Sequence, residues 1–299
     1  MRLIGVLASE HIASGLVAGH RLAGPVVKYP SNSSEVDCLD HMPADEILRA
    51  IQQEVLTLAG GEPVDAVGVG VPGIVRDGVM LEAPNLPQIK GLDIRGRLTE
   101  MLGTNHVLVL NDADAMAAGV AASRDHLDRL VRVWMLGTGI GYGRYPQLEG
   151  MWEGGHCAVT LDPTERYCGC GGVGHLEGVM GYRAMRLRFL DLEPEEVFEQ
   201  AREGDERCRD FVKLWHRALA AATGSSIHLD GPGKFYITGP MARFVDSDLL
   251  NSYLQETVRM SSLQGSFVEV VITTDDVAVI GAAVDAGQAF PKPVVNGVR

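Results

Sequence analysis

The sequence predicts an α/β protein made of two successive α/β halves. Apolar runs with strand character alternate with helical segments along the chain, which is the pattern of α/β folds. Strands followed by a helix occur once before and once after about residue 112. The chain has 299 residues, 46% of them hydrophobic, so it is long enough to bury a core in each half.

Turn residues delimit the predicted elements of the first half. Apolar residues recur at helical spacing between Pro43 and Gly60, which predicts a helix there. The dipeptide Asp77-Gly78 is typical of a tight hairpin turn within 75–81. Further strands are predicted at 4–7, 13–18, 26–29, 65–71 and 107–110, and further helices at 92–102 and 112–122.

The second half contains two glycine-dense loops, at 137–143 and 168–174. The chain has 36 glycines, about 12% of its residues against a usual ~7%, so these loops are where we look for a site. Strands are predicted at 131–136, 235–238 and 268–272, and helices at 193–203, 206–228 and 277–290.

Charge and hydropathy exclude several classes of protein. With 26 basic and 39 acidic residues the net charge is −13, which repels phosphate backbones, so no nucleic-acid partner is expected. Apolar stretches fall short of the ~20 residues that a membrane span needs, and the first residues predict a strand rather than a signal peptide. We therefore expect a cytoplasmic protein with no membrane partner.

The loop after the strand 131–136 is rich in glycine. It places Thr138 between Gly137 and Gly139, in a turn whose backbone N–H groups can face an anion. A plain glycine hairpin explains the same residues, and the loop alone does not separate these interpretations. Two GxGxxG matches, at 68–73 and 169–174, lack the strand-to-helix context of a dinucleotide site, so we interpret both as chance.

Asn111 and Asp112 lie between a predicted strand and a predicted helix. Both residue types are favoured at helix N-caps, which is the simpler interpretation of the pair. A carboxylate at a strand end is also where an α/β fold places a catalytic base, and in phosphoryl transfer such a base accepts the proton of the attacking hydroxyl. Taken alone, the pair favours a cap.

Two cysteines and two histidines form a candidate zinc site. Cys168 and Cys170 are too close in sequence for an ordinary disulfide, whereas two thiolates and two imidazoles suit tetrahedral zinc. Four protein ligands would make the site structural; a glycine loop with incidental cysteines is the alternative. The predicted ligands are His156, Cys168, Cys170 and His175.

Two glutamates, Glu153 and Glu177, each lie within three residues of a presumed zinc ligand. A loop fastened by zinc would hold both carboxylates rigidly, as the binding of paired sugar hydroxyls requires.

Taken together and in order, these motifs resemble those of the ROK family of sugar kinases and related repressors. The resemblance covers most of residues 60–285. It implies an actin-like ATPase (RNase H-like) fold, with two α/β lobes and a central cleft for sugar and ATP. The matching segments are Gly68–Gly73, Ala83–Pro87, Asn111–Ala113, Leu136–Gly141, Glu153–His156 and Cys168–Glu177.

The resemblance implies a role for each matching residue. Asp112 would be the general base. Thr138, with Gly137, Gly139 and Gly239, would bind ATP, with Mg²⁺ neutralising the transferred charge. Structural Zn²⁺ would be held by the four ligands named above. The residues implied to bind sugar are Gly73, Asn85, Asn111, Asp112, Glu153, His156 and Glu177.

The implied lobes divide the chain near residue 111. Residues 1–111 would form the N-terminal lobe, closed by the C-terminal helix 277–299, and residues 112–276 the C-terminal lobe with the zinc-binding loop. The chain is further expected to be a homodimer whose other partners are a small-molecule sugar and ATP.

The chain departs from the family pattern at three places. The fourth zinc ligand is a cysteine in the family and is His175 here; imidazole is an equally good ligand, so zinc is expected to remain. The first phosphate loop, DxGGT, is absent, and the bulkier Ser9, Glu10 and His11 would crowd phosphates. The adenosine-side Gly-Gly motif is altered around Gly239.

The predicted function is ATP-dependent phosphorylation of the 6-hydroxyl of a glucose-like hexose or aminosugar, such as glucose or kanosamine. The alternative, which the lost loop motivates, is a catalytically weak or inactive sugar-binding protein. A ROK-type repressor is not expected, because such repressors carry an additional N-terminal helix-turn-helix segment, whereas this chain begins with a predicted strand.

Overall fold

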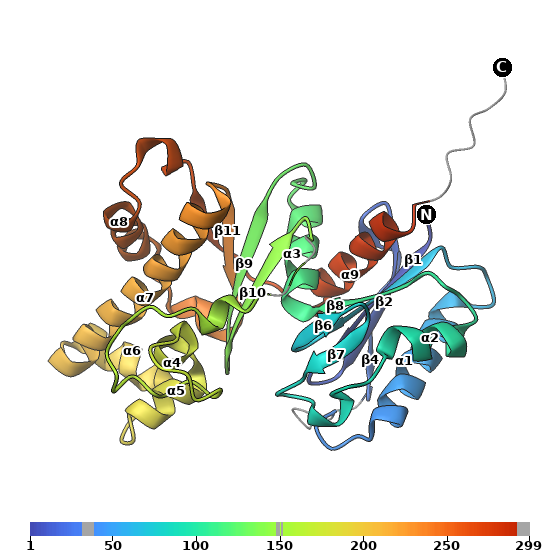
Figure 1. Ribbon diagram of the computed structural model, residues 1–299, viewed down its shortest axis with the longest axis horizontal. Coiled ribbons are helices and arrows are strands. Elements are labelled where there is room, and N and C mark those ends of the chain that lie inside the picture. The colour runs from blue at the N-terminus through green and yellow to red at the C-terminus, as the bar shows by residue number, and fades with distance from the viewer. Residues whose placement is uncertain (32–38, 148–149, 151, 292–299) are drawn as a thin grey trace. The chain divides into compact units, whose positions relative to one another are not determined.

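The computed structural model describes residues 1–31, 39–147, 150 and 152–291. The chain forms two compact units, drawn in Figure 1. Unit 1 comprises Met1–Val131, Gly143–Met151 and Thr273–Arg299, and unit 2 comprises Arg132–Tyr142 and Trp152–Ile272.

The division differs from the predicted boundary at residue 111. Helix α3 (Asp112–Ser123) belongs to unit 1, because it packs along helix α9 (Asp275–Ala289) in the same unit. The last residues of the predicted C-terminal helix, 292–299, lie outside the described residues.

Unit 1 is built on a mixed sheet with the strand order β3-β2-β1-β5-β8, to which β4 adds by pairing with β2. Strands β1, β5 and β8 run parallel, whereas β2 runs antiparallel to β1. The strands are β1 (Leu3–Ala8), β2 (Ile12–Ala18), β3 (Arg21–Leu22), β4 (Val27–Tyr29), β5 (Ala66–Val71) and β8 (Val107–Asn111).

Helices cover both faces of this sheet (Figure 1). Helices α1 (Ala44–Ala59) and α2 (Ile94–Leu102) share a core with alternate strand residues such as Ile4 and Val6. Helix α9 packs on the opposite face, against residues such as Leu3. The strands are buried on both faces, which explains their nearly continuous apolar sequences.

The helix ends and the hairpin turn predicted for the first half are confirmed. Helix α1 begins after Pro43 and ends at Gly60, whose φ of 59° is the left-handed conformation that glycine favours. Asp77 and Gly78, with φ of 54° and 82°, turn the hairpin between β6 (Ile74–Arg76) and β7 (Val79–Glu82). The short helix η1 (Pro87–Ile89) follows.

Unit 2 is built on a four-stranded sheet with the order β10-β9-β11-β12, in which β11 and β12 are parallel. Its core includes the fully buried Trp134 and Trp215. The strands are β9 (Val131–Leu136), β10 (Ile140–Tyr145), β11 (Lys234–Thr238) and β12 (Phe267–Val270). The helices are η2 (Gly154–His156), α4 (Leu176–Met180), α5 (Tyr182–Arg188), α6 (Pro194–Glu203), α7 (Glu206–Asp230), η3 (Pro240–Phe244), α8 (Ser247–Thr257) and η4 (Ser261–Leu263).

The sequence missed the helices α4, α5 and α8. The first two are only five and seven residues long, too short for helical periodicity to show. For α8 a signal was available, because the carboxylate of Asp246 caps it by accepting from the N–H groups of Asp248 and Leu249. Within the described residues, no helix combines the length and the apolar character that crossing a membrane requires.

Candidate active site

Strand β8 ends at Asn111, and this residue is the N-cap of α3. Its Oδ1 accepts hydrogen bonds from the backbone N–H groups of Ala113 at 2.8 Å and Asp114 at 3.3 Å. Its Nδ2 donates to the carbonyl oxygen of Gly73 at 2.8 Å. The structure thus brings Asn111 and Gly73 together, and the predicted cap falls on Asn111 rather than on Asp112.

Asp112 occupies the first position of α3, directly after the carboxyl end of a parallel strand. Its Oδ1 accepts from the N–H of Ala113 at 2.9 Å. Burial raises the pKa of Asp112 to about 6, and backbone hydrogen bonds limit the rise. A carboxylate with such a pKa at this place in the fold has the properties of a general base.

The other two sugar residues predicted in unit 1 have different surroundings. Gly73 has a φ of 110°, and a Cβ there would lie 2.2 Å from the carbonyl oxygen of Glu82, so only glycine fits. Asn85 is exposed in the bend between β7 and η1.

In unit 2, Gly137, Thr138 and Gly139 form the turn between β9 and β10, a geometry that fits both the plain hairpin and the anion-binding turn. The N–H of Gly137 donates to the carbonyl oxygen of Gly139 at 3.0 Å, and Thr138 is exposed. The start of α5 supports the turn, because the N–H of Tyr182 donates to the carbonyl oxygen of Gly137 at 3.0 Å. Tyr182 is not among the predicted site residues, because α5 is too short for helical periodicity to show it.

Gly239, which precedes η3, lies beside this turn. Its φ is 94°, and a Cβ there would lie 2.5 Å from the carbonyl oxygen of Leu136. A Cβ added at Gly137 would lie 3.8 Å from the ring of Pro240. The two glycine-containing segments predicted for nucleotide binding therefore meet, at the carboxyl ends of β9 and β11.

The four predicted zinc ligands converge. Their ligand atoms all lie within 4.8 Å of one another. The Sγ of Cys168 lies 3.3 Å from the Nδ1 of His156 and 3.3 Å from the Sγ of Cys170, which lies 3.3 Å from the Nδ1 of His175. Tetrahedral zinc, with bonds of about 2.0–2.3 Å, separates its ligands by roughly 3.3–3.8 Å, so these residues fit zinc.

In the absence of a metal, the thiol of Cys168 is protonated at neutral pH. The residue is 5% exposed, and burial is the main cause that raises the pKa of its thiol to about 12. A bound zinc ion would convert this buried thiol to the thiolate that coordinates it.

Glu177, in the first turn of α4, lies between the zinc ligands and the glycine turn. Its Oε1 accepts from the Sγ of Cys168 at 3.3 Å and from the N–H of Gly169 at 3.4 Å. Its Oε2 accepts from the N–H of Ile140 at 3.3 Å. Glu153 is exposed by contrast and precedes η2.

The chain matches the model of the ROK family over residues 31–288. It belongs to the ROK family. A glucokinase of Thermotoga maritima is 30% identical to it over 321 residues, which cover 95% of this chain and 96% of the relative. A kanosamine kinase of Amycolatopsis mediterranei is 29% identical over 216 residues, which cover 67% of this chain and 69% of the relative.

Among solved structures, a ROK hexokinase from Thermus thermophilus superposes with a TM-score of 0.79. It is 23% identical to this chain, and the match covers 97% of this chain and 99% of the other. This likeness confirms the predicted actin-like ATPase fold.

This ROK-family chain has a short β1–β2 turn where the resemblance expected the first phosphate loop. The Nε2 of His11, at the end of the turn, lies 2.9 Å from the Oδ2 of Asp275, which also accepts from the Nζ of Lys28 at 2.6 Å. Burial would raise the pKa of Asp275, but the hydrogen bonds from Lys28 and His11 outweigh it and hold this pKa below its ordinary value. The sequence did not predict this cluster.

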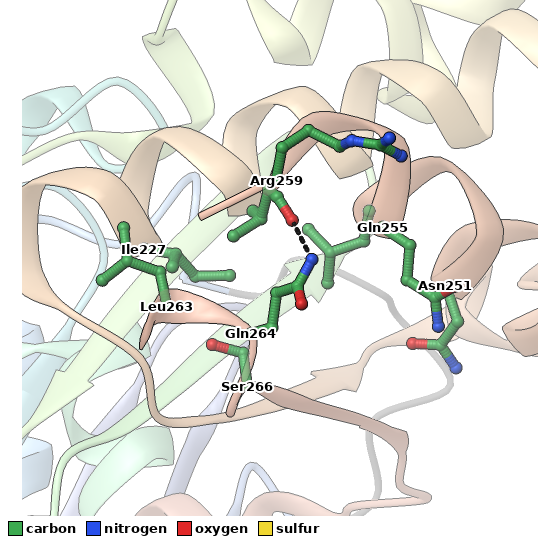
Figure 2. Close-up of a pocket in the computed structure, with 9 residues that line it drawn as sticks. Ile227, Asn251, Gln255, Arg259, Leu263, Gln264 and Ser266 are labelled. Carbon is green, nitrogen blue, oxygen red and sulfur yellow. Dashed lines mark hydrogen bonds between the residues drawn. The ribbon is translucent and has the colours of Figure 1, made fainter. Parts of the chain in front are cut away.

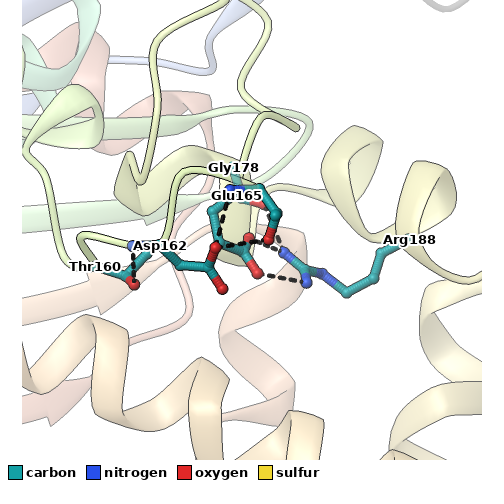
Figure 3. A network of polar contacts seen from close by, with 6 residues as sticks. Thr160, Asp162, Glu165, Gly178 and Arg188 are labelled. Atoms are coloured by element: carbon teal, nitrogen blue, oxygen red, sulfur yellow. Dashed lines mark hydrogen bonds and ion pairs between the residues drawn. The ribbon is translucent and has the colours of Figure 1, made fainter.

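A partly buried ion pair ties the loop with the zinc ligands to α5 (Figure 3). Arg188 donates to both carboxylate oxygens of Glu165, one at 2.9 Å, and to the carbonyl oxygen of Gly178 at 3.4 Å. The carbonyl oxygen of Glu165 accepts from the N–H of Gly174 at 2.8 Å. These contacts hold the loop against α5 and do not require the metal.

A hollow of about 340 Å³ lies elsewhere in unit 2 (Figure 2). It adjoins Ser266, which precedes β12, and so lies at the amino end of the parallel strands rather than at the end marked by Gly239. None of the predicted site residues lines it. Its lining is Ile227, Asn251, Leu254, Gln255, Val258, Arg259, Leu263, Gln264 and Ser266.

Proposed function

We propose that this ROK-family sugar kinase transfers the γ-phosphoryl group of ATP to the 6-hydroxyl of a glucose-like hexose or aminosugar, with Asp112 as the general base. The observation that carries the proposal is the position of Asp112, at the end of a parallel strand, with a pKa of about 6. A base with this pKa is ionised at neutral pH and still attracts a proton, as general-base catalysis requires.

The proton of the attacking hydroxyl would move to Asp112 as the new P–O bond forms. Asn111 supports this role, because its bonds to the N–H groups of α3 and to the carbonyl of Gly73 fix the residue next to the base. Positioning of this kind lowers the barrier of phosphoryl transfer, in which the protein does little covalent chemistry.

On the sugar side, the proposal assigns hydroxyl contacts to polar side chains of both units. In unit 2 these are Glu153, His156 and Glu177, and in unit 1 they are Asn85 and Asn111, with Gly73 next to Asn111. Relatives named as a glucokinase and a kanosamine kinase make glucose and kanosamine the first candidates. The carboxylates would also accept a hydrogen bond from the ammonium group of an aminosugar.

For the nucleotide, the proposal assigns the phosphates to the turn of Gly137, Thr138 and Gly139 and the adenosine side to Gly239. Mg²⁺ bound with ATP would neutralise the charge of the transferred phosphoryl group. Structural zinc on His156, Cys168, Cys170 and His175 would hold the loop that leads into α4, the helix that carries Glu177. The predicted homodimer and cytoplasmic location stay predictions.

One observation favours a second candidate, a sugar-binding protein with little or no kinase activity. The β1–β2 turn offers no glycine loop, and His11 is already bound to Asp275. Phosphate binding would then depend mainly on the turn at 137–139.

The deciding experiment measures turnover with ATP and Mg²⁺ for each of four sugars: glucose, kanosamine, glucosamine and N-acetylmannosamine. The release of ADP is the measured quantity. Sugar-dependent turnover that Asp112→Asn abolishes supports the kinase. Binding of a sugar by calorimetry with no turnover of any of the four would contradict the kinase and support the second candidate.

A further inference from the structure

Helices α3 and α9 touch backbone to backbone. A Cβ at Gly281 would lie 1.8 Å from the carbonyl oxygen of Ala115, and a Cβ at Gly119 would lie 1.8 Å from that of Val277. The residue numbers rise along one helix as they fall along the other, so the helices are antiparallel. The next turn of α9 after Gly281 therefore brings Asp285 to the first turn of α3.

Each of these two helices carries one buried acidic side chain. Asp114 and Asp285 are each only 5% exposed. The Oδ1 of Asp114 accepts from the N–H of Arg144 at 2.9 Å. The Oδ2 of Asp285 is buried and has no hydrogen-bond partner among the residues that the structure describes. An ionised carboxylate in that situation is costly, because nothing replaces its lost hydration.

The sheet beneath α9 offers Asp285 no compensating charge. The strands β1, β2, β5 and β8 contain no Asp, Glu, Lys, Arg or His. The edge strand β3 contributes Arg21, which is exposed. Beyond the end of α9, His106 stacks on Phe290 with ring centroids 5.0 Å apart.

The remaining neighbours of Asp285 lie on α3 and on the segment after Gly143. Asp114, whose negative charge acts on Asp285, belongs to the first turn of α3, and Arg144 and Tyr145 belong to β10. The hydroxyl oxygen of Tyr145 accepts from the Nε2 of Gln288 at 2.7 Å. Burial first, and the negative charge of Asp114 second, raise the pKa of Asp285 to about 8.

We propose that Asp285 is a positioning residue for the reaction: its protonated carboxyl donates to Asp114 across the α3–α9 interface and holds the first turn of α3, with the catalytic Asp112, in place. This proposal rests on the proposed function. Asp114 lies two residues after Asp112 in the first turn of α3, and its carboxylate also accepts from the N–H of Arg144. A change in the hydrogen bonds of Asp114 would therefore shift the turn that carries Asp112. Loss of the proton to solvent leaves two facing carboxylates, which repel each other and loosen this turn.

The proposal predicts an alkaline limit to catalysis. As the pH rises through about 8, kcat of the natural protein should fall while KM for the sugar stays unchanged. The amide of Asp285→Asn can still donate a hydrogen bond but cannot lose a proton. The kcat of this variant at neutral pH should therefore stay within about twofold of the natural value, and it should not fall as the pH rises through about 8. Asp285→Leu has a similar volume but no donor, and its kcat at neutral pH should be about tenfold lower than that of the natural protein.

A second measurement, the pH dependence of stability, detects the proton on Asp285 without an activity assay. The folded chain holds a proton that the unfolded chain releases above the ordinary value of 3.8, so the stability that this proton contributes is complete below 3.8 and is lost as the pH rises to about 8. Across that window the Tm of the natural protein should fall relative to that of Asp285→Asn. Asp276→Asn, in the first turn of the same helix, is the matched control and should leave both profiles as they are.

Each outcome decides a part of the proposal. An Asp285→Asn protein with the same alkaline fall as the natural one, or an Asp285→Leu protein with full kcat, would overturn the positioning role. Parallel Tm profiles for the natural protein and Asp285→Asn would overturn the buried proton. If no sugar is phosphorylated at all, the proposed function fails and the positioning of Asp112 fails with it, whereas the Tm profiles still decide whether the proton is there.

Discussion

The Oε2 of Glu177 accepts the N–H of Ile140 at 3.3 Å, while the Oε1 of the same carboxylate accepts the Sγ of Cys168 at 3.3 Å. Its Oε1 also accepts from the N–H of Gly169 at 3.4 Å, a bond that does not depend on the thiol proton, so this side chain joins the glycine turn proposed for ATP to the loop that holds the predicted zinc ligands. A Cβ at Gly139 would lie 2.6 Å from this carboxylate, which shows how closely the turn is seated on it. A change at Glu177 is expected to affect both substrates.

Glu177→Gln should raise KM for the sugar and KM for ATP, each by about tenfold, because an amide replaces a charged acceptor of two backbone N–H groups. Steady-state kinetics with each substrate varied in turn measures both constants. Glu153→Gln is the control, since Glu153 is exposed and its substitution should raise only KM for the sugar. A Glu177→Gln protein with unchanged KM for ATP would mean that the carboxylate does not support the turn.

The protein should carry about one zinc per chain when it is purified without added metal, because four ligand atoms lie within 4.8 Å of one another. Metal analysis measures the content. His175→Cys should retain the metal, since a thiolate replaces an imidazole, whereas Cys170→Ser should lose it and lower Tm. A metal-free protein with an unchanged Tm would contradict the site.

Asp112→Asn should lower kcat by at least about a thousandfold while sugar affinity stays within about tenfold, because the change removes the proton acceptor and keeps the shape. In the natural protein kcat/KM should fall as the pH drops through about 6, where Asp112 gains a proton and ceases to act as a base. Turnover and calorimetric sugar titration measure the two effects. If kcat and sugar affinity fell by the same factor, Asp112 would be a sugar ligand and not the general base.

Nucleotide affinity should be weak in the absence of sugar, because the β1–β2 turn supplies no glycine loop and His11 is bound to Asp275. Sugar should strengthen it, since the two substrates favour the same conformation. Calorimetric titration with a non-hydrolysable ATP analogue and Mg²⁺, with and without the sugar, tests both statements. No binding at millimolar concentration in either condition would mean that ATP is not the phosphoryl donor.

Much of the fold could be predicted because its signals are local. Gly60 ends α1 and Asp77-Gly78 turns a hairpin through preferences of those residues alone. The observed division differs from the predicted boundary at residue 111, because helix α3 is grouped with the unit in which it packs on α9. The packing of α3 on α9 joins segments more than 150 residues apart, which no local pattern reveals.

The zinc ligands were predictable for the same reason, since they lie within 20 residues of sequence. The contact of His11 with Asp275 spans 264 residues, and neither residue stands in a motif. Asp285 gave no signal either: it is the one acid beyond the first turn of a largely apolar helix, and its role depends on the charge of Asp114, far away in the sequence. Sites formed by residues close together in the sequence could therefore be predicted. Charge interactions between residues far apart in the sequence could not.

The backbone contact between α3 and α9 has a consequence for how this enzyme can evolve. Most helix pairs tolerate substitution because side chains between them can change rotamer, but at Gly119 and Gly281 carbonyl oxygens lie where a methyl group would have to go. Any larger residue must separate the helices, and the displacement would reach the turn that holds Asp112. Mutant libraries aimed at new sugars should therefore contain almost no active clones altered at these two glycines, while the exposed β7–η1 bend around Asn85 accepts variation and offers a place where specificity can diverge.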